Sequence, residues 1–250
     1  MFNAAKKTAF IVAAAAAAVA AGSASAEQMT MTFTGLGPSQ IVGVNYNAGR
    51  SYAAGPVSGY SYYYAGLMKW NTAWGQRTTF CTQINEHVWN GLTVTYDVVD
   101  VSQVPDTNPA PGPMGAIKAE LVRELYGRFY DTVRGSNDAT LNAAFQLAIW
   151  EITHENLTGA NTALAAGQLN LGLGAVQADS KKNGAVVATA GSMLGMLGGA
   201  SDENWNDGRL FGLSHATAQD QLLIVPIPAV LGVAAAGLLG VIGLRRRLVK

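Results

Sequence analysis

The chain has 250 residues, a formal net charge of zero at pH 7, and charged side chains at only 13% of its positions. This composition offers no basic face for nucleic acid and no acidic run that would store cations. The single cysteine, Cys81, excludes an internal disulfide, so it is a buried spectator, a partner for another chain, or a reactive group.

Residues 1–26 have the three parts of a secretory signal peptide. Lys6 and Lys7 precede an apolar, alanine-rich run, which ends in the small-residue site Ala24-Ser25-Ala26. A retained membrane anchor is the alternative, but a bilayer takes roughly 20 apolar residues and this run is shorter. We therefore expect signal peptidase to cleave after Ala26 and the chain to be exported.

Residues 27–223 form the body, which is long enough for one extracellular domain with a substantial core. Its first half is typical of strands: MTMTFTG and LTVTYDVVDV alternate apolar and polar residues, and GYSYYYAGLMKW is rich in aromatics. Tyr60, Tyr62 and Tyr64 would share one strand face. They either pack against the sheet or form a stacking surface for carbohydrate.

The second half is typical of helices. After a proline-rich loop, apolar spacing and capping residues predict helices over 114–132 and 139–154, a weaker helix within 175–198, and one or two closing strands after residue 209. The chain is therefore predicted to be an α+β protein, with a β-rich sandwich or barrel-like body and a helical subdomain. A signal peptide and a C-terminal hydrophobic helix flank this domain.

Gln146 is an uncharged amide in the otherwise apolar helix 139–154. It lies at the edge of a predicted buried stripe made of Leu141, Phe145, Ile149 and Ile152. A buried amide needs partners for its oxygen and both hydrogens, because a lost partner costs about 1–3 kcal/mol. On composition alone, hydrogen bonds to loop backbone are the ordinary explanation.

Two segments point to a different role for this amide. TTFCTQINEHVW contains Phe80-Cys81, and AAFQLAIWEI contains Gln146 followed by Ala148, Ile149 and Trp150. Together they resemble the paired motifs of thioester-forming surface domains, where a cysteine after an aromatic residue is joined to the glutamine of a Thr-Gln-x-Ala helix start. The resemblance, which spans about residues 78–156, implies that Cys81 and Gln146 form the thioester pair. Phe145 stands where that family has threonine.

The implied chemistry assigns roles to neighbouring residues. A thiolate at Cys81 would attack the Gln146 amide carbon and expel ammonia, which leaves an acyl thioester. Because water attacks a thioester, apolar lids are needed, and the expected lids are Phe80, Phe145 and Trp150.

A base is needed for proton transfer. The candidates are His87 and His154, although a surface or capping position explains either histidine as well. Glu151 would orient the site or lie solvated on its helix. A lysine amine or sugar hydroxyl of a partner would displace Cys81 and stay attached through the Gln146 acyl group. This reaction happens once per molecule, so the resemblance implies an adhesin and no enzyme.

Residues 224–250 are typical of a C-terminal membrane segment. A Val225-Pro226-Ile227-Pro228 breaker precedes an apolar run and a terminal basic cluster of Arg245, Arg246 and Arg247. This arrangement resembles the PEP-CTERM sorting signal in its Val-Pro-x-Pro-Ala variant. The resemblance implies an exosortase-like transpeptidase as a partner and at least transient anchoring by this helix. An ordinary anchor flanked by arginine is the alternative.

These observations predict an exported protein of the cell surface or extracellular matrix, coupled through Cys81 and Gln146 to a nucleophile on a surface protein or polysaccharide. The alternative is a non-covalent structural protein with the same scaffold, and a Cys-His hydrolase is a third choice. No cofactor or metal is expected, since SDENWNDG lacks the closing glutamate of a calcium loop. Nucleic acid is not an expected partner.

Overall fold

The computed structural model describes residues 27–106, 110–199 and 209–225. The expected signal peptide lies outside these ranges, as does the sorting segment from Pro226 onward, including Pro228 and the arginines at 245, 246 and 247. Within the described ranges, no helix has the length and apolar character needed to cross a bilayer.

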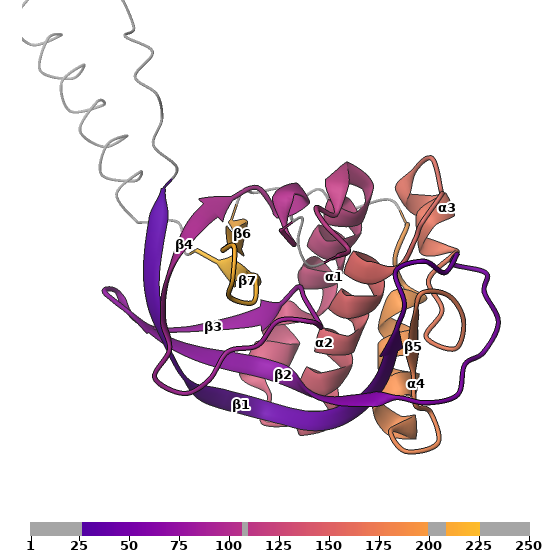
Figure 1. Cartoon of the computed structure of the whole chain (residues 1–250), viewed down its shortest axis with the longest axis horizontal. Coiled ribbons are helices and arrows are strands. Elements are labelled where there is room, and N and C mark those ends of the chain that lie inside the picture. Colours follow the sequence, from indigo (N-terminus) through magenta and orange to yellow (C-terminus); the bar gives the residue numbers. More distant parts are fainter. Residues whose placement is uncertain (1–26, 107–109, 200–208, 226–250) are drawn as a thin grey trace, which may run out of the picture.

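Four strands from the first half form one antiparallel sheet with a short strand at residues 176–178 and two strands from the end of the described chain. The strands are β1 (Gln28–Tyr46), β2 (Ser61–Thr72), β3 (Gly75–Cys81), β4 (Thr93–Val99), β5 (Val176–Ala178), β6 (Leu210–Ser214) and β7 (Gln221–Ile224). The order β2-β3-β7-β6-β4-β1 closes on itself because β1 also pairs with β2, and β5 extends the edge of β1 beyond β4. The predicted α+β class is confirmed, with a large antiparallel sheet (Figure 1).

The alternation in the sequence explains β1 and β4. Met29, Met31 and Phe33 are buried, while Thr30 and Thr32 face outward. Each outward threonine forms a cross-strand hydrogen bond at 2.8 Å with a threonine of β4. Such pairs stabilise adjacent strands while the opposite face joins the core.

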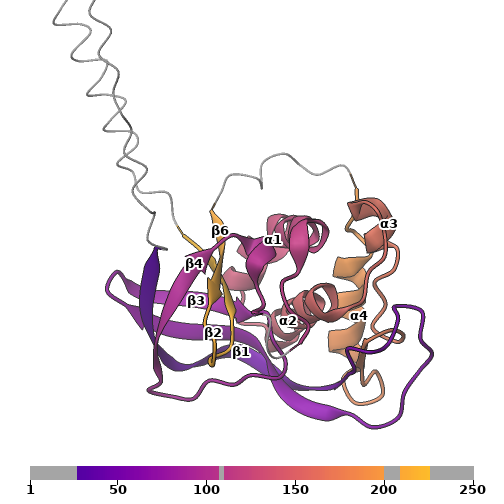
Figure 2. The same ribbon diagram turned by 45° about the horizontal axis from the view of Figure 1, so that its top comes forward.

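In the described part of the chain, four α-helices follow the proline-rich loop: α1 (Gly115–Gly135), α2 (Ala139–His154), α3 (Thr162–Ala166) and α4 (Gly184–Leu194). The helices predicted over 114–132 and 139–154 are confirmed, although α1 continues to Gly135. The helix predicted within 175–198 is wrong at its beginning, because Val176–Ala178 form β5 and pair with β1. Figures 1 and 2 show α1, α2 and α4 gathered on one side of the curved sheet.

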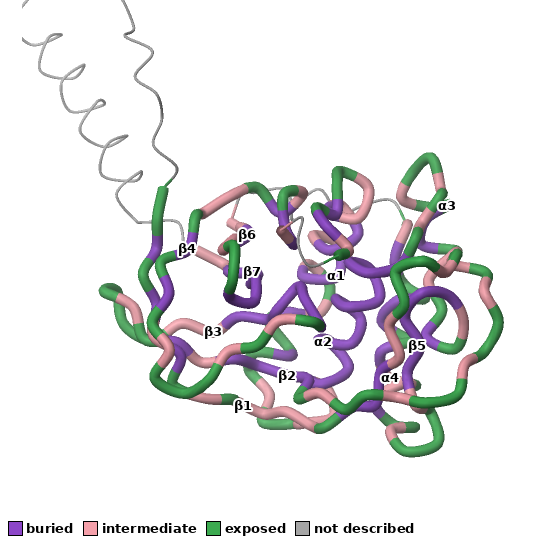
Figure 3. The backbone as a smooth tube through the Cα atoms, viewed as in Figure 1, coloured by how far each residue is buried: buried purple, intermediate pink, exposed green. Residues whose placement is uncertain are grey.

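Helix α2 lies at the centre of the molecule. Asp138 caps it by accepting hydrogen bonds from the N–H groups of Thr140 and Leu141. Every residue from Asn142 to His154 is buried, because β1, β2 and β3 cover one side of the helix while α1 and α4 cover the others (Figure 3). The prediction of a single buried stripe is therefore wrong, and Gln146 is buried as deeply as the apolar residues around it.

Candidate functional site

The site begins where β2 separates from β3. The two strands pair from Thr72 and Gly75 as far as Met68 and Thr79, and no pairing continues to Cys81. On the other edge of β3, Cys81 lies opposite Gln221 of β7, and the N–H of Thr82 bonds to the Asp220 carbonyl at 2.9 Å. Alternation along the strand therefore directs the N–H and C=O of Cys81 towards the side that β2 has left.

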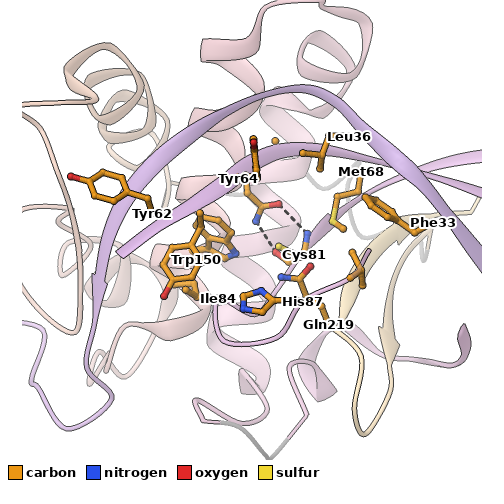
Figure 4. Close-up of a pocket in the computed structure, with 14 residues that line it drawn as sticks. Phe33, Leu36, Tyr62, Tyr64, Met68, Cys81, Ile84, His87, Trp150 and Gln219 are labelled. Atoms are coloured by element: carbon orange, nitrogen blue, oxygen red, sulfur yellow. Dashed lines mark hydrogen bonds between the residues drawn. The ribbon is translucent and has the colours of Figure 1, made fainter. Parts of the chain in front are cut away.

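The side-chain amide of Gln146 lies beside Cys81 where β2 no longer pairs with β3, and it makes the hydrogen bonds that a neighbouring strand would make. Its Oε1 accepts from the backbone N–H of Cys81 at 3.0 Å, and its Nε2 donates to the Cys81 carbonyl at 2.7 Å. Figure 4 shows these two bonds as dashed lines between α2 and the end of β3. The structure thus brings together Cys81 and Gln146, which are 65 residues apart in the chain.

Gln146 belongs to a row of side chains along α2 that bind the segment 81–84. Thr153 donates from Oγ1 to the Thr82 carbonyl at 3.1 Å, and His154 accepts at Nε2 from the Ile84 N–H at 3.3 Å. Trp150 follows Gln146 by four residues, and Thr153 and His154 follow Trp150 by three and four, so these side chains lie along one side of the helix. This face fixes the backbone that carries the thiol.

The Cys81 thiol lies in a largely dry environment. Burial raises its pKa to about 12, so the group is a neutral thiol in the folded chain. The indole N–H of Trp150 has no conventional hydrogen-bond partner, and its interaction with the Cys81 sulfur lowers the thiol pKa in part. Trp150 would therefore stabilise negative charge on this sulfur whenever the sulfur acts as a leaving group.

A hollow of about 300 Å³ opens beside Cys81 and Gln146, and we call it the thiol hollow. Its wall includes Tyr63, Met68, Ile84, His87 and Trp150. His87 lines the same hollow as Cys81. Figure 4 shows the Tyr62 ring pointing away from Cys81. No lysine, arginine, aspartate or glutamate is among the described residues that line this hollow.

Of the three expected lids, only Trp150 lines the hollow. Phe80 and Phe145 are fully buried and pack against each other with ring centroids 4.8 Å apart. The ring of Phe145 also packs against that of Tyr126 of α1, with ring centroids 5.1 Å apart. Neighbouring residues on a strand point to opposite faces, so Phe80 faces the helical core when Cys81 faces the hollow. Phe80 and Phe145 are therefore core residues of this site.

The two candidate bases are placed very differently. His87 is exposed and lines the thiol hollow. His154 is buried, and because its Nε2 accepts from Ile84, the ring proton lies on Nδ1, which is 3.2 Å from the Trp150 carbonyl. Burial, together with the nearby charge of Lys118, lowers the His154 pKa to about 3. Both ring nitrogens of His154 therefore have hydrogen-bond partners on the backbone. His154 stabilises the segment that contains Ile84 and does not act as a base.

Glu151 neither orients the hollow nor lies in solvent. It is fully buried, and its Oε1 accepts from the N–H of Asn170 at 2.7 Å. Burial raises its pKa well above the usual range. Glu151 therefore ties α2 to the loop before β5, away from Cys81.

The tyrosines of β2 divide between the two faces of the strand. Tyr62 and Tyr64 are 47% and 64% exposed, and Lys182 Nζ lies 3.9 Å from the Tyr62 ring centroid. The Tyr62 ring crosses Gly43 of β1, where a Cβ would lie only 2.9 Å from the ring. Tyr63 points inward and contacts Trp150. The alternation along β2 that turns Tyr62 and Tyr64 outward is the sequence signal that places Tyr63 on the inner face, beside the site.

Gln219 also lines the hollow, and no sequence signal marked it. Its Nε2 donates to the carbonyls of Gln83 and Glu86, both at 2.8 Å, and so holds the loop that carries His87. Within the described part of the chain, no group of three or more His, Cys, Asp or Glu residues is placed to hold a metal ion.

No protein-family model, curated protein or solved structure matches this chain. Its function is therefore argued from the geometry of Cys81, Gln146 and their surroundings.

Proposed function

We propose that this chain is an exported surface protein in which Cys81 and Gln146 condense to an internal thioester, which then couples once to a nucleophile on a partner. One observation carries the proposal: the Gln146 amide is hydrogen-bonded on both sides to the residue that bears the only thiol of the chain. The Gln146 amide is thereby held against the backbone of Cys81 in a buried position.

The hydrogen bonds suit the condensation itself. When the Cys81 sulfur bonds to the Gln146 amide carbon, charge develops on Oε1, and the Cys81 N–H at 3.0 Å is already directed at that oxygen. The C–Nε2 bond then breaks, and the thiol proton leaves with Nε2 as ammonia. Because the thiol starts neutral, this direct transfer to the departing nitrogen needs no free thiolate.

The surroundings of Cys81 and Gln146 would protect a thioester from water and still allow a nucleophile to reach it. Cys81 is 3% exposed and Gln146 is 1% exposed, so bulk water has little access to the bond. The thiol hollow provides an approach for a nucleophile, with His87 on its wall to accept the proton. Cys81 would leave as a thiol, and the partner would remain on Gln146.

Export and sorting complete the proposal. Residues 1–26 would direct secretion, and residues 224–250 would anchor the chain in the membrane until an exosortase-like transpeptidase acts on the Val225-Pro226-Ile227-Pro228 motif. A single coupling event at the surface is the chemistry of an adhesin or a matrix attachment domain, so the protein is proposed to have no turnover.

A second candidate is a non-covalent surface scaffold. The observation that favours it is that the oxygen and the nitrogen of the Gln146 amide each already have a hydrogen bond to the Cys81 backbone, so the amide stabilises the end of β3 without any reaction. The two candidates differ in covalent structure, and mass measures that directly.

The test is the intact mass of the freshly purified full chain. The thioester predicts a mass lower by one ammonia, restored to the sequence value in Cys81→Ala, and methylamine added to Gln146 in peptide maps of the treated protein. Gln83 is equally buried and is the internal control that should remain unmodified. A plain sequence mass together with no methylamine on Gln146 would exclude the thioester and leave the scaffold.

A further inference from the structure

A second hollow adjoins the thiol hollow, and we infer from its lining that the acceptor of the acyl group is an uncharged saccharide hydroxyl. This inference rests on the proposed thioester. It adds the class of partner and the surface that would bind it.

The second hollow, which we call the side hollow, has a volume of about 360 Å³. Ligand sites commonly enclose roughly 300–1,000 Å³. It forms where the end of β1, the start of β2 and the loop after β3 meet, and its polar and aromatic lining comprises Asn45, Tyr46, Tyr60, Ser61, Tyr63 and Asn85.

The two hollows share a wall. Tyr63 lines both of them, and its ring centroid lies 6.3 Å from that of Trp150, which in turn lines the thiol hollow. Asn85 of the side hollow directly follows Ile84 of the thiol hollow in the chain. A molecule bound in the side hollow would therefore lie next to the wall that Tyr63 forms for the thiol hollow, which Gln146 also lines.

The lining of the side hollow has hydrogen-bonding groups that the protein leaves unused. Asn45 uses Nδ2 to bond the Gly59 carbonyl at 2.8 Å, which leaves its Oδ1 free. The side chains of Ser61 and Asn85 are exposed and have no hydrogen bond within the described chain. The Tyr46 hydroxyl is buried without a partner. Neutral amides and hydroxyls can both donate and accept, as sugar hydroxyls require.

The absence of charge argues against a lysine side chain as the acceptor. No aspartate, glutamate, lysine or arginine is among the described residues that line either hollow. An ammonium group would lose its hydration here without gaining a carboxylate partner. Aromatic rings beside neutral polar groups suit a sugar, which has apolar ring faces and a hydroxyl rim.

The transfer step balances with the groups present. The sugar oxygen bonds to the acyl carbon of Gln146 while the bond from that carbon to the Cys81 sulfur breaks. His87 takes the hydroxyl proton and passes it to the departing sulfur, with Trp150 beside that sulfur. The products are a saccharide ester on Gln146 and a free Cys81 thiol, and no other reactant is consumed.

The test incubates the full chain separately with a neutral glucose oligomer, a polygalacturonate oligomer and a lysine-containing peptide, with methylamine in a parallel tube. Mass spectrometry then identifies any adduct on Gln146, and hydroxylamine distinguishes a labile ester from a stable amide. The variants are Tyr63→Leu and Asn85→Ala, and Trp74→Ala is the matched control because Trp74 is 59% exposed and lines neither hollow. Asn85 is exposed and its side chain has no hydrogen bond within the described chain, so Asn85→Ala remains informative if Tyr63→Leu misfolds.

We expect the neutral oligomer to form a hydroxylamine-labile adduct. Tyr63→Leu and Asn85→Ala should each lower its rate by about tenfold, which is the effect of losing one contact worth about 1.4 kcal/mol. Asn85→Ala, which lines only the side hollow, should leave methylamine addition unchanged, and the Trp74→Ala protein should react like the wild type. If methylamine and the peptide react but no saccharide does, the acceptor inference is overturned and the proposed function stands. If even methylamine fails to react, the proposed function itself is refuted, and saccharide transfer is refuted with it.

Discussion

Replacing Gln146 by leucine tests whether the amide substitutes for the missing strand beside β3. The comparison is between the Cys81→Ala protein and the same protein with Gln146→Leu added, so that neither of the two contains a thioester cross-link. Leucine nearly preserves the volume but removes both hydrogen bonds, at 3.0 Å and 2.7 Å, to the backbone of residue 81. One buried N–H and one buried C=O are then left without partners.

The expected loss follows from these two groups. An unsatisfied buried polar group costs about 1–3 kcal/mol, so two of them lower the free energy of unfolding by about 2–6 kcal/mol. A typical domain has about 5–15 kcal/mol in total, and the double variant should therefore be near the limit of folding.

Urea unfolding followed by far-UV circular dichroism measures this loss. The matched control is Gln28→Leu, because the side chains of Gln28 and Asp97 form their hydrogen bond in solvent, and its loss should change stability by no more than about 0.5 kcal/mol. If Gln146→Leu lowers the free energy of unfolding by less than about 1 kcal/mol, the amide does not complete the sheet and the reasoning about this site is wrong.

Four further outcomes follow from the same contacts. Opening a thioester with methylamine releases a loop of 65 residues, so urea unfolding should show a loss of about 4 kcal/mol in the wild type and none in Cys81→Ala. His87→Ala should still have an intact mass lower by one ammonia, but it should form the ester about 100-fold more slowly. An unchanged rate of ester formation would exclude His87 from the mechanism. Phe145→Ala should lower the free energy of unfolding by about 3–5 kcal/mol, as expected for a core residue, and a smaller loss would mean that Phe145 is not part of the core. Burial raises the Asp220 pKa from 3.8 to about 7, so the folded state holds this proton more tightly than the unfolded chain does. The free energy of unfolding should therefore fall as the pH rises from about 4 to about 7. If Asp220→Asn leaves this pH dependence unaltered, the assignment to Asp220 is wrong.

Local signals in the sequence predicted most elements and their ends. Asp138 marks the beginning of α2 because a side-chain oxygen at that position satisfies free N–H groups, which is a property of a few neighbouring residues. Alternation likewise predicted the strands around Met31 and Thr95. The central position of α2 was not predictable in this way, since its burial comes from sheet and helices that are distant in sequence.

The site was predictable only in part for the same reason. The resemblance named Cys81 and Gln146, but the separation of β2 from β3 that makes room for the amide depends on strand register, which no short segment encodes. Phe80 and Phe145 were expected at the site because they adjoin the pair in sequence. Phe80, however, points to the opposite face of β3 from Cys81, and Phe145 lies on a different side of α2 from Gln146. His154 carried the chemistry of a base, yet its hydrogen bond to Ile84 gives it a structural role.

The position of β7 determines how the domain would carry mechanical load. This strand lies between β3 and β6, and at residue 225 it leads directly into the C-terminal segment. A pull on that segment would shear β7 against the strand that carries Cys81, whereas a load on Gln146 would enter through α2 in the interior. A molecule held at Gln146 and at its C-terminal segment would therefore be stretched across the contact between α2 and β3. Its resistance to the force would depend on how stably the four residues of β7 pair with β3 and β6.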